Sequence, residues 1–221
     1  MKKLVIFDMD GVLIDTEKVS DLSWIDTFKH FRKDVNEDLR HEFVGKGPKH
    51  YFSILHDIAS NDEEMNEMIV YQKEKYAEIM KVYGKNIKPG VQDLIEWLIA
   101  NNIYISVASS TKRKSAEASL KEVGLFEYFD YMLFGDDVID SKPNPEIYIR
   151  TLEYFGMHKE EALIIEDSYY GVLAAKNAEI DVLWVKDVVD LDKFEGVNYR
   201  AKFDSLLEAK SYVASLVKSS F

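Results

Sequence analysis

Asp8 and Asp10 stand two positions apart and directly follow a short apolar run at residues 4–7. The run is unbroken and too short for a helix, so it predicts a buried strand. The two carboxylates then lie just past the carboxyl end of that strand, where open α/β sheets bind ligands. Gly11 lets the backbone turn sharply and approach a ligand closely. Because two carboxylates held together repel each other, the pattern indicates a bound cation or a shared proton.

This pair of aspartates suits phosphoryl transfer. One aspartate can attack phosphorus as a nucleophile and form an aspartyl-phosphate. The other can give a proton to the leaving group and later activate a water. A divalent cation beside them would screen the repulsion between carboxylate and phosphate and orient the oxygens for in-line transfer. Taken alone, Asp8-Met9-Asp10-Gly11 is equally consistent with a polar turn, since Asp and Gly are common turn residues.

The longer string from Asp8 to Glu17 favours the chemical interpretation. Its first five residues, Asp8-Met9-Asp10-Gly11-Val12, resemble the first motif of the haloacid dehalogenase (HAD) superfamily, D-x-D-G-[TV]. The extension to Glu17 is similar to the subfamily that contains β-phosphoglucomutase and small sugar-phosphate phosphatases. The resemblance implies that Asp8 is the nucleophile and Asp10 the acid and base.

The composition agrees with a soluble enzyme. A chain of 221 residues with 47% apolar content can form one core with a modest insert, or two small domains. The formal charge of −12 argues against nucleic acid or an anionic membrane surface as partner. The absence of cysteine excludes disulfides and thiolate chemistry. No stretch reaches the length of a membrane span, and Asp8 interrupts the first apolar run too early for a signal peptide. We therefore expect a cytoplasmic protein, and nothing in the pattern demands more than a monomer.

The chain divides into a helical insert and an alternating remainder. Helical periodicity without any strand fills the segment after residue 16, and Gly84 is placed to end its last helix. Later strands are predicted at 103–107, 131–134, 162–165, 182–185 and 201–203. They alternate with helices, which predicts an α/β fold with a doubly wound, Rossmann-like parallel sheet. The resemblance implies an HAD core at 1–15 and 86–221 and a helical cap domain at 16–85, inserted after the first strand.

Helix bounds also follow from periodicity, capping residues and glycines. A loop is predicted at residues 45–49, where two glycines and a proline occur together. In the insert, the spacing of aromatic and methionine side chains predicts packing rather than recognition, and the charged run at 73–75 predicts a solvated face. These packing residues are Trp24, Phe28, Phe31, Met65, Met68 and Tyr76. The predicted helices span 17–31, 38–44, 50–59, 62–83, 92–100, 111–123, 145–155, 171–178 and 205–217.

Two serines, Ser109 and Ser110, follow the second predicted core strand. A hydroxyl at a strand end that opens a helix can bind a phosphate oxygen together with backbone N–H groups. These residues and Thr111 could also do no more than cap the helix. The resemblance implies that Ser109 binds the phosphate, with Ser110 beside it, and Lys112 then faces substrate or solvent.

Lys142 precedes Pro143 in a segment that is otherwise typical of a solvated loop. The resemblance makes this Lys-Pro pair the third motif. It implies that the ammonium group neutralises the phosphate and the attacking carboxylate as charge builds up. Pro143 restricts Lys142 to an extended backbone, which helps to aim the side chain.

Glu166 and Asp167 end the apolar run at 163–165 and form a second acidic strand end. Two such ends in one sheet favour a shared metal site, and oxygen-only ligands suit Mg²⁺ better than zinc. The resemblance implies that Asp167 binds Mg²⁺ directly and that Glu166 does so directly or through water. Asp8 and the carbonyl oxygen of Asp10 would complete the protein ligands.

The resemblance leaves a phosphatase and a mutase open. Mutases of this subfamily resemble Asp-Thr-Glu-x-x-His, and Ser20 occupies the position of that histidine. The loop at 45–49 also lacks an arginine for a distal phosphate, although Lys46 or Lys49 could serve as point charges. We expect a Mg²⁺-dependent phosphatase that hydrolyses small phosphorylated metabolites, sugar phosphates in particular. The alternatives are a β-phosphoglucomutase-type mutase and, more remotely, a non-catalytic sugar-phosphate sensor.

Overall fold

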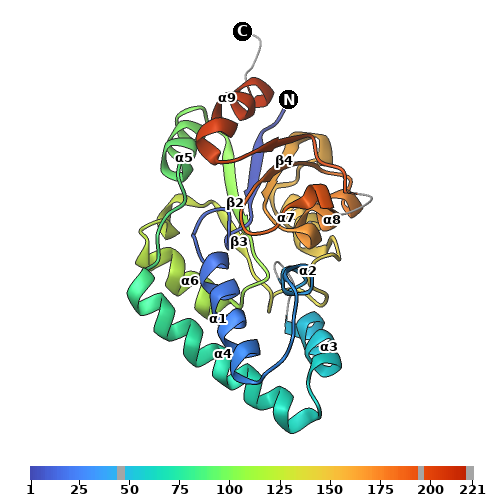
Figure 1. The fold of residues 1–221 in the computed structure, drawn as a ribbon. Helices are drawn as coiled ribbons and strands as arrows, with labels where there is room; N and C mark the ends of the chain where they lie inside the picture. Colours follow the sequence, from blue (N-terminus) through green and yellow to red (C-terminus); the bar gives the residue numbers. More distant parts are fainter. Residues whose placement is uncertain (44–47, 194–196, 218–221) are drawn as a thin grey trace.

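A six-stranded parallel sheet forms the centre of the computed structural model, which describes residues 1–43, 48–193 and 197–217 (Figure 1). The strand order is β3-β2-β1-β4-β5-β6, and every neighbouring pair is parallel. The first strand therefore lies in the middle, between β2 and β4. The strands are β1 (Leu4–Phe7), β2 (Tyr104–Ala108), β3 (Tyr131–Leu133), β4 (Ala162–Glu166), β5 (Asp181–Val185) and β6 (Ala201–Phe203).

Helices cover both faces of this sheet. Successive side chains of a strand point to opposite faces, so Val5 and Phe7 join one apolar cluster while Leu4 and Ile6 join another. All four side chains are fully buried, which confirms the predicted doubly wound α/β fold. The helices of this part are α5 (Val91–Ala100), α6 (Arg113–Glu122), α7 (Glu146–Phe155), α8 (Tyr169–Asn177) and α9 (Leu206–Val217).

In the described part of the insert after β1 there are four helices: α1 (Glu17–His30), α2 (Glu37–His41), α3 (Pro48–Ile58) and α4 (Asp62–Tyr83). In Figure 1 they lie together below the sheet, with α1 against the long α4. They share an apolar cluster of their own, which buries Trp24, Phe28 and Met68 as the helical spacing predicted. Across the described ranges, no helix is both long and apolar enough to cross a membrane.

The two segments that join the insert to the sheet domain lie side by side. Ile14 and Ile87 form an antiparallel bridge, and the backbone N–H of Asp15 donates to the carbonyl of Asn86 at 2.9 Å. The chain therefore leaves the sheet domain and returns to it at one place.

Most predicted elements are confirmed to within one or two residues, and two differences have clear causes. Helix α6 begins at Arg113 rather than Thr111, because Lys112 has an extended backbone with φ −63° and ψ 141°. The strand-end serines therefore stay in a loop that faces the insert. The loop predicted at 45–49 is wrong at its end, since α3 begins at Pro48. Proline is favoured at the first position of a helix, where its missing N–H is not needed.

Candidate active site

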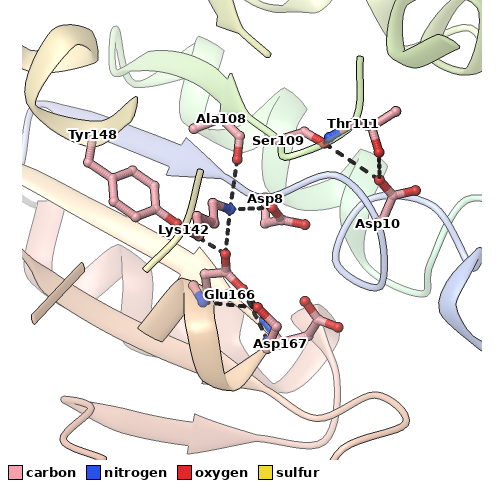
Figure 2. A network of polar contacts seen from close by, with 11 residues as sticks. Asp8, Asp10, Ala108, Ser109, Thr111, Lys142, Tyr148, Glu166 and Asp167 are labelled. Carbon is pink, nitrogen blue, oxygen red and sulfur yellow. Dashed lines mark hydrogen bonds and ion pairs between the residues drawn. The ribbon is translucent and has the colours of Figure 1, made fainter. Parts of the chain in front are cut away.

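The carboxyl end of β1 places Asp8 in a buried network of opposite charges (Figure 2). Asp8 is 7% exposed and Lys142 is 1% exposed. The Lys142 ammonium donates to Asp8 Oδ1 at 2.5 Å, to Glu166 Oε1 at 2.6 Å and to the carbonyl of Ala108 at 3.0 Å. Because an ammonium has three donors, this side chain is fully committed to fixed partners. It holds one oxygen of Asp8 and leaves the other uncovered.

Glu166 anchors this network to the end of β4. Its Oε1 accepts from Lys142 and, at 3.0 Å, from the Tyr148 hydroxyl. Its Oε2 accepts from the N–H of Asp167 and from both the N–H and the hydroxyl of Ser168, each at 3.0 Å. Both oxygens of this fully buried carboxylate are therefore occupied by donors from the protein.

Burial and mutual repulsion disturb the titration of these groups. Burial raises the pKa of Asp8 to about 8; Lys142 opposes this shift, while Glu166 and Asp10 add to it. Burial also raises the pKa of Asp167, and Glu166 and Asp8 raise it further. Burial disfavours the charged Lys142, but Asp8 and Glu166 outweigh that effect and raise its pKa well above the usual range. The site therefore contains more acidic groups than its own lysine can keep ionised.

Three buried carboxylates, those of Asp8, Glu166 and Asp167, can each offer an oxygen within 4.8 Å of the others. Oxygen donors at this spacing fit Mg²⁺. Since the oxygens of Glu166 already accept five hydrogen bonds, Asp8 and Asp167 are the members with oxygens left for a cation. The contribution expected from Asp10 through its carbonyl oxygen stays a prediction.

Asp10 lies across the site from Lys142 and is held by hydroxyl groups (Figure 2). Thr16 donates to its Oδ1 at 2.6 Å, and Thr111 donates to its Oδ2 at 2.7 Å. The Ser109 hydroxyl approaches the same Oδ2 at 3.5 Å. Thr16 immediately precedes α1, so these contacts connect Asp10 to both the insert and the end of β2.

The two serines at the end of β2 differ in their contacts. The Ser109 hydroxyl accepts the N–H of Thr111 at 3.0 Å. The Ser110 hydroxyl oxygen is buried and has no hydrogen-bond partner within the described part of the chain. Both serines line the cleft described next, so the unpaired hydroxyl is available to a bound oxyanion.

A cleft of about 500 Å³ lies between these groups and the insert. Its floor includes both aspartates of the first motif, together with Ser109, Ser110, Thr111 and Lys112. Its wall, from the insert, combines aromatic and polar side chains. These are Glu17, Ser20, Trp24, Phe43, Tyr51, Phe52, Gln72, Lys73 and Tyr76.

Several wall residues were not predicted as site residues. Tyr76 was expected in the helix packing, and that expectation is wrong, because its side chain lines the cleft. Lys73 is exposed, as expected of a solvated face, and it lines the cleft as well. Gln72 and Lys73 lie four and three positions before Tyr76, so each is a neighbour of Tyr76 on the surface of α4. This mixture of neighbouring polar and aromatic residues on the surface of one helix is the sequence feature that could have indicated a cleft-lining surface. Glu17 also lines the cleft, where burial and the nearby Asp10 raise its pKa.

The two cap lysines proposed for a distal phosphate cannot be placed in the cleft. Lys46 lies outside the described residues. Lys49 lies in the first turn of α3, but its side chain is outside the description.

The chain belongs to the haloacid dehalogenase-like hydrolase family, whose model matches residues 5–185. It is 34% identical over 182 residues to a phosphorylated carbohydrates phosphatase of Thermotoga maritima, a match that covers 81% of this chain and 83% of the relative. The predicted superfamily is thus confirmed. The predicted class of phosphoric monoester hydrolase is confirmed as well, since relatives of this chain in the family are named phosphatases.

Solved structures agree with the fold over nearly the whole chain. A putative beta-phosphoglucomutase from Thermotoga maritima superposes with a TM-score of 0.73 and 28% identity, covering 97% of this chain and 99% of that one. CbbY from Rhodobacter sphaeroides in complex with phosphate gives a TM-score of 0.74 and 25% identity, covering 95% and 96%. The likeness therefore includes the insert as well as the sheet.

Proposed function

We propose that this protein is a Mg²⁺-dependent phosphatase that hydrolyses small phosphate monoesters, with sugar phosphates as its substrate class, through an aspartyl-phosphate. One observation carries the proposal. Asp8 is buried at the floor of the cleft with Oδ1 fixed by Lys142 and Oδ2 free of protein donors across the described residues. A carboxylate with one oxygen fixed and one free is prepared for in-line attack.

The proposed reaction has two steps. In the first, a free oxygen of Asp8 attacks phosphorus, the bond from phosphorus to the ester oxygen breaks, and Asp10 gives its proton to the leaving alcohol. In the second, Asp10 takes a proton from water, the water oxygen attacks phosphorus, and the bond to Asp8 breaks to release inorganic phosphate. Lys142 stabilises the negative charge on the attacked group in both steps.

The phosphate would be stabilised by the positive charge of Lys142, whose three donors are already used, and would bind to the hydroxyls of Ser109 and Ser110. The Ser110 hydroxyl has no other partner in the part of the chain described. Asp8, Asp167 and the Asp10 carbonyl would hold Mg²⁺. Glu166, whose oxygens already accept five hydrogen bonds, would hold Lys142 in place. When bound, the ion supplies positive charge that offsets the repulsion between carboxylates and phosphate. This assignment agrees with the all-oxygen donor set and with the excess of acidic groups at the floor.

We assign residues 16–85 to a cap domain that selects the leaving group, and residues 1–15 and 86–221 to the catalytic core. The wall supplied by the insert combines aromatic surfaces such as Trp24 and Tyr51 with hydrogen-bonding groups such as Gln72. Such a mixture suits a polyhydroxylated leaving group. Lys46 and Lys49 remain candidates for a second phosphate. The name of the Thermotoga relative, a phosphatase of phosphorylated carbohydrates, supports the same substrate class.

The test is phosphate release from a panel of sugar phosphates and a generic aryl phosphate, with Mg²⁺ or with a chelator. Asp8→Asn keeps the shape of the side chain but removes the nucleophile, so turnover should fall below about a hundredth of wild type. Asp181→Asn is the control, because it removes an acid at the amino end of β5, where it pairs with Lys2 at 2.9 Å. Retained turnover in Asp8→Asn, with circular dichroism unchanged, would reject the covalent mechanism.

A phosphosugar mutase is the second candidate, because a putative beta-phosphoglucomutase is among the similar structures. Ser20 lines the cleft, and no histidine does so among the described lining residues. A mutase must keep water away from the acyl phosphate until a sugar returns, and serine cannot carry charge near neutral pH as imidazole can. With β-glucose 1-phosphate and a bisphosphate primer, we expect inorganic phosphate to exceed glucose 6-phosphate. Isomerisation faster than hydrolysis would favour the mutase.

A further inference from the structure

Asp187 is an acidic residue near the site that neither the motifs nor the proposed reaction uses. It follows β5 by two positions, and β5 pairs with β4, whose end carries Glu166 and Asp167. Parallel neighbours end at the same edge of a sheet, so Asp187 lies on the ligand-binding edge. Its side chain is 8% exposed.

The two oxygens of Asp187 have different surroundings. Oδ1 pairs with the ammonium of Lys88 at 2.5 Å, and Lys88 is itself only 17% exposed. Oδ2 is buried and accepts no hydrogen bond within the described ranges. A buried carboxylate oxygen without a donor is costly, so it indicates a partner that the protein itself does not provide.

Gly11 shows where this free oxygen points. The backbone of Gly11 has φ 82°, and a side chain there would overlap Asp167 Oδ2 and lie 3.0 Å from Asp187 Oδ2. The two carboxylate oxygens therefore converge on the same point above the first-motif backbone. One oxygen comes from the end of β4, and the other comes from the segment after the neighbouring strand β5.

Asp187 is not among the three carboxylates that lie within 4.8 Å of one another, so its place is outside the direct ligands. Glu166, which is among them, already has both oxygens occupied by protein donors. Among the described residues, Oδ2 of Asp187 is therefore a buried carboxylate oxygen that lies near Asp167 and has no donor of its own.

We propose that Asp187, held in place by Lys88, is an additional carboxylate of the cation site and binds a water of the hydrated Mg²⁺ beside Asp167. An oxygen at this position accepts a hydrogen bond from metal-bound water and adds negative charge near the ion. Lys88 is the positioning residue, because it fixes the other oxygen of the same carboxylate. The inference rests on the metal site of the proposed function.

The test measures Mg²⁺ binding directly, by isothermal titration calorimetry of the metal-free protein without substrate. Three variants are compared with wild type: Asp187→Asn, the charge-balanced double variant Lys88→Gln/Asp187→Asn, and Asp181→Asn. The double variant leaves no unpaired lysine, so it also serves if the single variant folds poorly. Asp181→Asn removes an acid from the other end of β5, where it has its own lysine partner.

Loss of an outer partner of a metal site lowers affinity by about tenfold or more, and we expect that loss in both Asp187 variants and none in Asp181→Asn. If Asp187 acted only through its charge, the double variant would bind Mg²⁺ like wild type, because the pair it removes is neutral. That result, or unchanged affinity in Asp187→Asn, would overturn the inference. Absence of Mg²⁺ binding by wild type would instead count against the metal site of the proposed function.

Discussion

The floor and the wall of the cleft are stabilised in different ways. On the floor, Asp8, Lys142 and Glu166 are almost fully buried, and each has charged partners within 2.6 Å. On the wall, side chains from separate helices of the insert line the cleft, and some of them make hydrogen bonds between uncharged groups. An example is the Gln72 amide, which donates to the Ser23 hydroxyl at 2.9 Å.

Under the proposed function, this difference is expected to separate chemistry from substrate selection. A buried charge is tolerated only when its partners are fixed, so substitution of Asp8, Lys142 or Glu166 is expected to be costly. The wall consists mainly of aromatic and polar groups at helix surfaces, with Glu17 and Lys73 as its charged members, and substitutions at such surfaces have smaller effects. We therefore expect the floor to decide whether phosphoryl transfer occurs and the wall to decide which ester is accepted.

The largest effect should come from breaking the floor with Lys142→Met. This change leaves Asp8 and Glu166 buried without their shared cation. Turnover should fall by about a thousandfold, and the free energy of unfolding should fall by about 3 kcal/mol. Phosphate release and urea denaturation measure the two effects. Lys3→Met, which removes an exposed ammonium paired with Glu161 at 2.7 Å, is the matched control. A fall in turnover of less than about tenfold, with an unchanged free energy of unfolding, would show that the floor and the wall do not differ in this way.

The buried Asp8 on the floor should also make the free energy of unfolding depend on pH. In the metal-free protein the pKa of Asp8 is about 8, against an ordinary value of 3.8, so the folded state binds a proton that the unfolded state has released. Its contribution to stability is therefore complete at low pH and lost as the pH rises towards 8. Urea denaturation in chelator from about pH 5 to about pH 8 should show falling stability, and Asp8→Asn should flatten the slope. A slope that is equal in both proteins would contradict the assignment.

A smaller effect is expected where the floor meets the loop before α6. Thr111→Val removes the hydroxyl that donates to Asp10 Oδ2, so the acid should lose its fixed orientation. We expect kcat to fall by about tenfold, a fraction of what general acid catalysis contributes. Thr111→Ser keeps the hydroxyl and should stay near wild type. Equal kcat values for the valine and serine variants would remove Thr111 from the account of Asp10.

The smallest effect should come from the wall, with Tyr76→Phe. The loss of one hydroxyl near the leaving group should raise KM for sugar phosphates by about threefold and leave kcat nearly unchanged, as expected for one neutral hydrogen bond. A generic aryl phosphate, which has no sugar hydroxyls, should show no change. An equal change in KM for both kinds of ester would show that Tyr76 does not contribute to selection.

Sequence alone predicted the floor better than the wall, for a physical reason. Asp8, Ser109 and Asp167 each end a buried strand, and parallel strands bring their carboxyl ends to one edge. Strand order and pairing therefore place these residues together without knowledge of any side-chain contact. Lys142 comes from a connection rather than a strand, and only its resemblance to a family motif indicated a role.

The wall and Asp187 were missed because their positions depend on how separate elements pack. Helical spacing shows that Tyr76 shares a face with apolar neighbours, but it does not show whether that face meets another helix or an opening. Asp187 acquires its surroundings from Lys88, which is distant in sequence and lies just after the insert. The periodicity of one segment does not show which side chains of a distant segment it will contact.

The pairing of the two linking segments also has a consequence for how this chain can vary. Asp15 and Asn86 are hydrogen-bonded neighbours. With respect to the sheet domain, the whole insert is therefore one loop whose two ends are held together. The entropy of closing a loop grows only with the logarithm of its length, so adding or removing helices beyond that point changes little for the sheet. Substrate range can thus diverge through replacement of an entire segment, while the residues that carry out the chemistry stay where they are.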